Sequence, residues 1–245
     1  MDRQGTQFRM ASIVKSTQDD RTKEAIAWAS CNGFMVRSQK DNNLFDHAPF
    51  TLYPTVYPST LYEKAKTLTV PFNLLVDRVA RNDEWLRATL DEAAKVDPFV
   101  ADQMKIYKAV MKEGISQQTY LGIHRSDYMI HSPSSTGETK EEERILQVEL
   151  NTIAASFGCL SSKVNQMHQY LQQKEKLFQG STTNSSKAVL ANNNATEGLA
   201  NAIHKAHKQY ISQREDVSSP TSVLFVVQDG ETNTVDQRML EFELT

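Results

Sequence analysis

Residues 146–158, with the sequence LQVELNTIAASFG, decide how this chain is expected to fold. Apolar and polar residues alternate from Leu146 to Asn151, and a period of two residues is typical of a β-strand with one buried and one polar face. Glu149 and Asn151 are two residues apart, so both project from the polar face. The stretch therefore predicts a strand that carries a carboxylate next to an amide and ends in a short Ser/Gly turn.

A second strand is predicted over residues 121–130, LGIHRSDYMI, where Arg125 and Asp127 share a face by the same spacing. The segment between the two strands is polar and contains Ser, Pro and Gly, as a hairpin loop does. An antiparallel hairpin over residues 120–153 would gather an arginine, an aspartate, a glutamate and an asparagine into one patch. Such a patch is a reasonable platform for a charged small molecule and a metal ion.

Helical patterns and helix-end signals occupy the chain on both sides of the hairpin. The predicted helices cover residues 22–29, a run capped by Ser59 that Pro71 breaks in two, a run capped by Asn82 or Asp83, a run from Asp97-Pro98 to Gly114, and residues 161–173 and 195–210. In residues 161–173, Val164, Met167 and Leu171 recur at helical spacing and are expected to face a core, with His168 as an ordinary half-buried side chain. Residues 48–59, APFTLYPTVYPS, are expected to be extended but ordered, because their aromatic side chains need burial.

The last 30 residues carry a different pattern. Val223–Val227 is a continuous apolar run, typical of a strand buried on both faces of a parallel sheet, and a helix is predicted from Asp236. A buried parallel strand needs neighbours on both sides, and the sequence supplies no second strand of this kind. We therefore expect the chain to be the first part of a longer protein, ending just after the first βα unit of a doubly wound domain.

Composition narrows the class of protein. The chain has 245 residues, 39% hydrophobic and 23% charged, which is enough to bury a sizeable core. Its net charge is −3 and its basic residues are dispersed, so nucleic acid is not expected as a partner. No apolar run approaches the about 20 residues of a membrane span, no signal peptide is apparent, and two cysteines make no disulfide framework. These features predict a soluble, cytoplasmic protein with no membrane partner.

The hairpin patch is the candidate site. A carboxylate and an amide carbonyl on one strand face are oxygen ligands of the kind that suit Mg²⁺ when it shares its shell with phosphate oxygens. Arg125 could hold a substrate carboxylate with two parallel hydrogen bonds. The alternative is a solvated polar sheet face whose cross-strand Arg–Glu pair contributes little. Spacing alone favours this alternative and leaves both open.

Four segments shift that balance, because together they resemble eukaryotic glutathione synthetase. They are APFTLYPTVYPS at residues 48–59, FNLLVDRVARN at 72–82, LGIHRSDYM at 121–129 and VELNTIAASFGCL at 148–160. Their order and spacing are those of the family, and weaker similarity extends from about Thr22 to Leu244. The resemblance implies an ATP-grasp fold, with an ATP-binding region over residues 1–215 and the start of a substrate-binding domain over 216–245.

The resemblance also implies an activity and its residues. The family joins γ-glutamylcysteine to glycine, with ATP cleaved to ADP and phosphate through an acyl-phosphate and with Mg²⁺ as cofactor; its members form homodimers. Glu149 would contact ATP and ligate Mg²⁺ together with Asn151, and Arg125 would bind the substrate carboxylate. The remaining substrate-binding residues would be Ile153, Ala154, Ala155, Ser156, Glu231, Thr232, Asn233 and Gln237. Ala154 departs from the family, which has a serine hydroxyl there.

Three hypotheses about function follow. The first is a glutathione synthetase whose ATP-clamping lysines, glycine-rich lid and further substrate arginines would lie beyond Thr245, so that these 245 residues alone are expected to be inactive. The second is a truncated or diverged relative that binds or dimerises without catalysis. The third is an unrelated carboxylate-binding module.

Overall fold

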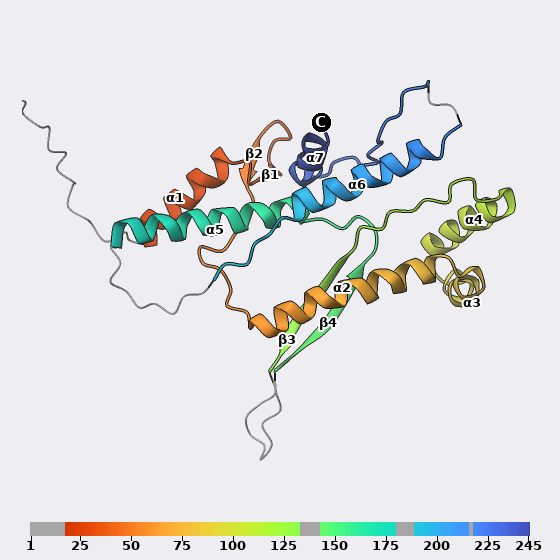
Figure 1. The fold of residues 1–245 in the computed structure, drawn as a ribbon, viewed down its shortest axis with the longest axis horizontal. Helices are drawn as coiled ribbons and strands as arrows, with labels where there is room; N and C mark the ends of the chain where they lie inside the picture. Colours follow the sequence, from red (N-terminus) through yellow and green to blue (C-terminus); the bar gives the residue numbers. More distant parts are fainter. Residues whose placement is uncertain (1–17, 133–142, 180–188, 216–217) are drawn as a thin grey trace, which may run out of the picture. The chain divides into compact units, whose positions relative to one another are not determined.

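The computed structural model describes residues 18–132, 143–179, 189–215 and 218–245 (Figure 1). They form mixed α/β structure, with seven helices and two small antiparallel sheets in the described ranges. The chain divides into two compact units. Unit 1 consists of residues 1–56, 157–200 and 224–245, and unit 2 of residues 57–156 and 201–223. None of the described helices combines the length and apolarity that crossing a membrane requires.

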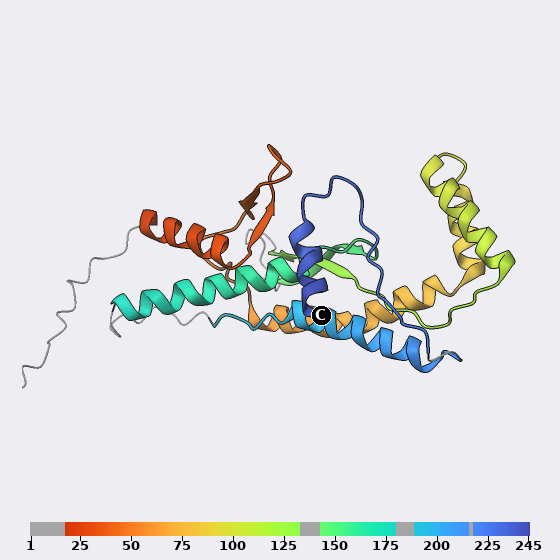
Figure 2. The same ribbon diagram turned by 90° about the horizontal axis from the view of Figure 1, so that it is seen from above.

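Unit 1 is built around the helix α5, Gly158–Gln179. Its other elements are α1 (Gln18–Cys31), the strands β1 (Met35–Arg37) and β2 (Phe45–His47), the start of α6 (Ala195–Ser212) and α7 (Thr234–Glu243). Helix α1 packs along α5, and α7 packs near the start of α5 (Figures 1 and 2). This places residues that are more than 70 positions apart in the sequence next to one another.

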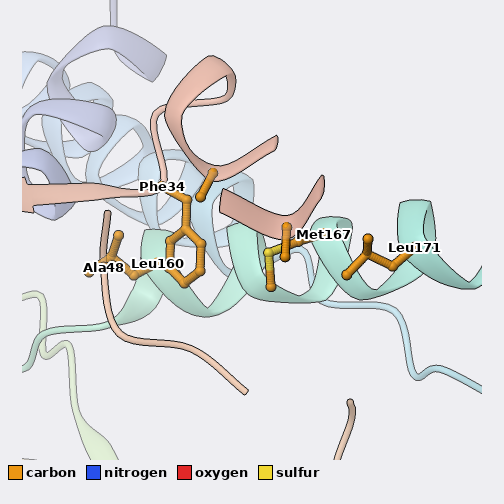
Figure 3. Packing of buried hydrophobic residues seen from close by; sticks show 7 residues of the cluster. Phe34, Ala48, Leu160, Met167 and Leu171 are labelled. Carbon is orange, nitrogen blue, oxygen red and sulfur yellow. The ribbon is translucent and has the colours of Figure 1, made fainter. Parts of the chain in front are cut away.

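The core of unit 1 lies between α1, the β1–β2 region and α5. Ala25 and Ala29 are fully buried on α1, and their small side chains let the backbone of α1 come close to α5. Opposite them Met167 is fully buried and Leu171 is 2% exposed, as their helical spacing predicts. The core cluster consists of Ala25, Ala29, Phe34, Ala48, Leu160, Met167 and Leu171 (Figure 3).

Residues 48–58 are irregular and only partly buried, so the expected burial of the side chains in residues 48–59 is confirmed in part. Phe50 and Leu52 pack against the core cluster, whereas Tyr53 is 55% and Val56 is 83% exposed. His168 is buried, and its Nε2 lies 2.8 Å from the carbonyl oxygen of Thr51. The imidazole therefore ties this segment to α5, a structural role in line with the expectation for this histidine.

Unit 2 contains three complete helices, the hairpin and the part of α6 from residue 201 onward. The helices are α2 (Ser59–Ala80), α3 (Asp83–Ala93) and α4 (Pro98–Glu113), and the strands are β3 (Arg125–His131) and β4 (Arg144–Asn151). The cap predicted at Ser59 is wrong, because Ser59 is the first residue of α2 and the residue before it, Pro58, forms no side-chain cap hydrogen bond. The caps predicted at Asn82 and Asp97 are confirmed. Asn82 accepts a hydrogen bond from the Trp85 amide at 3.0 Å and Asp97 from the Phe99 amide at 2.9 Å, and Gly114 ends α4.

The predicted helix break at Pro71 is wrong, because α2 continues through this residue. Proline lacks the N–H that would donate to the carbonyl of Thr67, four residues earlier. Thr67 is exposed, so water can satisfy that carbonyl. A helix of 22 residues thus tolerates one missing hydrogen bond at its surface.

The predicted parallel strand over Val223–Val227 is also wrong. The segment has no regular structure, and Leu224 and Val226 are 85% and 90% exposed. No strand in the described ranges pairs with it. An apolar run becomes a buried strand only where neighbouring strands bond its backbone, and these neighbours are missing here. The helix predicted after it is confirmed as α7.

Candidate functional site

The hairpin of β3 and β4 in unit 2 brings the four predicted polar residues together. Arg125 lies opposite Asn151 and Asp127 lies opposite Glu149 in the antiparallel register. Residues directly opposite one another in such a pair project from the same face of the sheet. The expected patch of an arginine, an aspartate, a glutamate and an asparagine is therefore confirmed, although β3 begins at Arg125 rather than at residue 121.

Hydrogen bonds link all four side chains. The Arg125 guanidinium donates to both oxygens of Asp127, from Nε at 2.9 Å and from NH2 at 3.0 Å. The same NH2 lies 3.5 Å from Oε1 of Glu149, and Nδ2 of Asn151 donates to that oxygen at 2.9 Å. Asp127 thus holds the guanidinium with two parallel bonds, and Glu149 completes the chain of contacts.

The pairing changes the acidity of two of these groups. The hydrogen bond from Arg125 holds the pKa of Asp127 below its ordinary value of 3.8, and the same bond raises the pKa of Arg125. Both side chains are about one-third exposed, so water screens the interaction. Asp127 and Arg125 therefore stay ionised at neutral pH, and the patch combines one fixed positive charge with carboxylates.

A β-bulge shapes the patch. Asp127 pairs with Glu149 while the next residue, Tyr128, pairs with Gln147, so Val148 is the extra residue on β4. The expectation that Leu146 and Val148 lie on a buried face is wrong, since they are 45% and 59% exposed. The bulge interrupts the alternation, and a sheet of two strands has little surface to cover.

The turn after β4 carries the next group of predicted site residues, Ile153 to Ser156. Ala154 has a φ of 50° and Phe157 a φ of 72°, both in the left-handed region. For residues with a Cβ atom this conformation costs about 1–2 kcal/mol each. Ile153 is 86% exposed. The turn is therefore a strained and exposed stretch of backbone, in which Ala154 offers no hydroxyl donor.

The last group of predicted site residues lies in unit 1, at the start of α7. Glu231 accepts a hydrogen bond from the Asn233 amide at 2.7 Å, and the carbonyl of Thr232 accepts one from the Arg37 amide on β1 at 2.8 Å. Gln237 follows in the first turn of α7. The bond between Arg37 and Thr232 holds the loop Glu231–Asn233 against β1, and the bond within the loop links its first and last residues. The hairpin and this loop belong to different units, and each is described within its own.

Asp236, one residue before Gln237, was not predicted as a functional residue. Its side chain is buried and accepts hydrogen bonds from three backbone amides around the start of α5. These partners lie 76 to 79 residues away in the sequence, so no local pattern pointed to it. Asp127 was placed in the hairpin patch by its spacing, but its part in holding Arg125 emerges only from the contacts.

The side-chain oxygens of Glu149 and Asn151 are of the kind that could hold a magnesium ion shared with a phosphate-bearing substrate. Mg²⁺ in such sites takes one or two protein carboxylates and fills its octahedral shell with phosphate oxygens and water. Glu149 is 55% exposed and its side chain is bonded to Asn151, so both can face one ion. Within the described ranges, no group of three or more His, Cys, Asp and Glu residues could hold a metal ion.

Over most of its length the chain is similar to known glutathione synthetases. The family profile described as "Eukaryotic glutathione synthase, ATP binding domain" matches residues 15–240. Glutathione synthetase of Rattus norvegicus is 38% identical over 229 residues, and that of Dictyostelium discoideum 35% over 236; each alignment covers 92% of this chain. The chloroplastic glutathione synthetase of Solanum lycopersicum is 32% identical over 228 residues, 90% of this chain.

The chain spans 45%, 46% and 38% of these three relatives, so less than half of their length. The profile match, by contrast, covers most of the chain and includes the hairpin, the turn and the loop before α7. On this evidence the chain belongs to the eukaryotic glutathione synthase family.

Proposed function

We propose that this chain supplies the magnesium- and substrate-binding part of an ATP-dependent ligase that joins γ-glutamylcysteine to glycine and so makes glutathione. The observation that carries the proposal is the hairpin patch, in which Arg125, Asp127, Glu149 and Asn151 share one face and one chain of hydrogen bonds. The family membership supports the proposed reaction class, in which ATP would activate the substrate carboxylate as an acyl-phosphate before glycine attacks.

In this proposal Glu149 and Asn151 hold the magnesium ion beside the ATP phosphates. Bound Mg²⁺ would neutralise phosphate charge during transfer of the phosphoryl group. Glu149 contributes an ionisable carboxylate and Asn151 an amide oxygen, and the bond between them keeps the two side chains at one place on β4. The atoms that react when ADP forms are those of ATP and the substrate.

Arg125 binds the carboxylate of γ-glutamylcysteine in this proposal. Its two bonds to Asp127 fix the plane of the guanidinium, so that the fork is oriented before substrate arrives. The contact of its NH2 with Glu149 is 3.5 Å long, longer than its two bonds to Asp127, and we expect the substrate carboxylate to replace this contact. That exchange leaves Glu149 available to the metal ion.

We further propose two groups of substrate contacts, one in each unit. In unit 2 they are Ile153, Ala154, Ala155 and Ser156, and in unit 1 they are Glu231, Thr232, Asn233 and Gln237. We also propose that the chain divides into an ATP-binding region over residues 1–215 and a substrate-binding domain from residue 216. We propose further that two copies of the protein associate and that the protein is located in the cytoplasm.

Turnover of substrate needs closure of the protein over ATP, because closure excludes water from the site. Because the hairpin patch is one-third to one-half exposed, we propose that the 245 residues alone bind without turnover.

The test is metal binding by the purified protein. Mn²⁺, a paramagnetic substitute for Mg²⁺, is titrated in the presence of ATP and followed by electron paramagnetic resonance. We expect Glu149→Gln to weaken Mn²⁺ binding at least about tenfold, because it removes the only charged ligand on β4 in the proposed set. Glu143→Gln, at the other end of the same hairpin, removes an exposed carboxylate and should bind as the wild type does. Equal binding by both variants would contradict the proposal.

A further inference from the structure

The carboxylate of Asp236 is 7% exposed and holds the start of α5 within unit 1. Its Oδ1 accepts hydrogen bonds from the amides of Cys159 at 2.8 Å and Leu160 at 2.9 Å, and its Oδ2 accepts one from Phe157 at 2.5 Å. Both oxygens are therefore used, and each serves a different part of the chain. Oδ1 caps the first turn of the helix, and Oδ2 holds the residue before it.

The first amides of an α-helix have no partner inside the helix, and a negative charge there is favourable. A residue just before the helix usually meets this need. At α5 the neighbouring residue is Phe157, which has no acceptor in its side chain, and the cap comes from α7 instead. A cap supplied from a distant element does more than satisfy amides, because it also fixes the position of one element against the other.

The two elements that Asp236 joins both lead directly into predicted substrate contacts. Phe157, which Oδ2 holds at a φ of 72°, directly follows Ser156, the last residue of the strained turn. On the other side, Gln237 is the next residue of α7. Resting on the function proposed above, we infer that Asp236 is a positioning residue within unit 1, which fixes the backbone of Phe157, the residue that directly follows the turn Ile153–Ser156, and sets the rotation of α7 that presents Gln237.

The different tasks of the two oxygens allow a variant that separates positioning from capping. Asp236→Asn keeps Oδ1 for Cys159 and Leu160 but places an NH2 group opposite the Phe157 amide, where two donors face each other. Asp236→Ala removes all three acceptors. Asparagine should therefore release the backbone of Phe157 while the helix stays capped, and alanine should lose both.

The experiment measures amide hydrogen exchange by NMR and, separately, binding of γ-glutamylcysteine by calorimetry, at a temperature where circular dichroism shows every variant folded. We expect Asp236→Asn to lose exchange protection at Phe157, to keep it at Cys159 and Leu160, and to bind γ-glutamylcysteine about tenfold more weakly. Asp236→Ala should lose protection at all three amides. Glu241→Gln, which removes an exposed charge from the same helix, should match the wild type in both measurements.

Each other outcome overturns the inference in a distinguishable way. If Asp236→Asn loses protection at Phe157 but binds γ-glutamylcysteine as the wild type does, the bond is only structural. If protection at Phe157 is unchanged, the carboxylate does not hold that residue. If the wild type itself shows no binding, the proposed function fails together with its positioning residue, while the exchange data still show whether the clamp exists.

Discussion

Glu24 lies between Lys174 and Tyr170, where α1 packs on α5. Lys174 Nζ is 2.6 Å from its Oε1, and the Tyr170 hydroxyl donates to the same oxygen. The hydrogen bonds from Lys174 and then from Tyr170 lower the pKa of Glu24, and in return the bond to Glu24 raises the pKa of both partners. These three groups form a polar contact beside an otherwise apolar helix interface, and they make its stability depend on pH.

The direction of that dependence follows from the shifts. The lowered pKa of Glu24 gives stability that is complete above its ordinary value of 4.5 and is lost as pH falls through the folded-state pKa. The raised pKa values of Tyr170 and Lys174 give stability that is complete below 10.0 and is lost as pH rises through the folded-state values. We expect Glu24→Gln to make the loss of stability smaller at both acid and alkaline pH. At neutral pH it should lower the free energy of unfolding by about 0.5–1 kcal/mol.

Urea unfolding across the acid and alkaline limbs checks this prediction. Asp19→Asn is the matched control, because Asp19 pairs with Lys23 on the same helix but both side chains are 72% exposed. It should change neither limb. A Glu24→Gln curve that runs parallel to the wild type at both ends would show that the cluster does not couple folding to pH.

At the scale of elements, both ends of α4 follow local chemistry closely. Helix α4 combines a capping aspartate, a proline in its first turn and a glycine with a φ of 100° just past its end. Each acts within a few residues: the carboxylate bonds free amides, proline has no amide to leave unpaired, and glycine adopts the left-handed conformation at no steric cost. These positions therefore mark where α4 begins and ends.

The cap of α4 gives a stability prediction at this scale. Asp97→Ala removes the acceptor for the amides of Phe99 and Val100 and should lower the free energy of unfolding by about 1 kcal/mol. Asp102→Ala, in the same helix, loses only an ion pair with Lys105 whose side chains are 70–77% exposed, and should change stability by less than about 0.5 kcal/mol. Chemical denaturation of both variants makes the comparison, and equal losses would show that the cap contributes nothing specific.

At the scale of the whole molecule, burial is uneven. Most of the buried apolar side chains in the described part of the chain belong to unit 1, whereas unit 2 contributes Met104 and Ile145. The polar hairpin therefore belongs to unit 2, which has fewer buried apolar side chains. In unit 1 the core that sets the stability lies along α5. Truncation of a side chain in that core should be costly.

Met167 is the test of that core. It is fully buried between α1 and α5, and Met167→Ala should destabilise the protein by about 2–5 kcal/mol, because it loses buried methylene and sulfur contacts and leaves a cavity. Met129→Ala makes the same chemical change on β3, where Met129 is 66% exposed, and should cost less than about 1 kcal/mol. The difference between their thermal midpoints is the measurement. Similar midpoints would contradict the assignment of the core.

The features that sequence alone determined are those whose causes lie within a few residues or within one strand pair. The caps at Asn82 and Asp97, the end of α4 at Gly114 and the inward stripe of α5 are of this kind. The hairpin patch belongs with them, because a period of two places Arg125 and Glu149 on one face once the strands pair.

Tertiary structure alone decided the features that depend on distant partners or on water. Asp236 caps a helix that begins 78 residues earlier, and nothing near it in the sequence indicates a buried carboxylate. The apolar run Val223–Val227 predicts a buried strand, but in the described ranges no strand lies beside it, and most of its side chains are exposed. Pro71 predicts a break in the helix, but α2 continues because the carbonyl of the exposed residue Thr67 can bond to water. In each case the local structure depended on which backbone N–H and C=O groups found a hydrogen-bond partner. Those partners are determined by the neighbours and the water that surround each group in the folded chain.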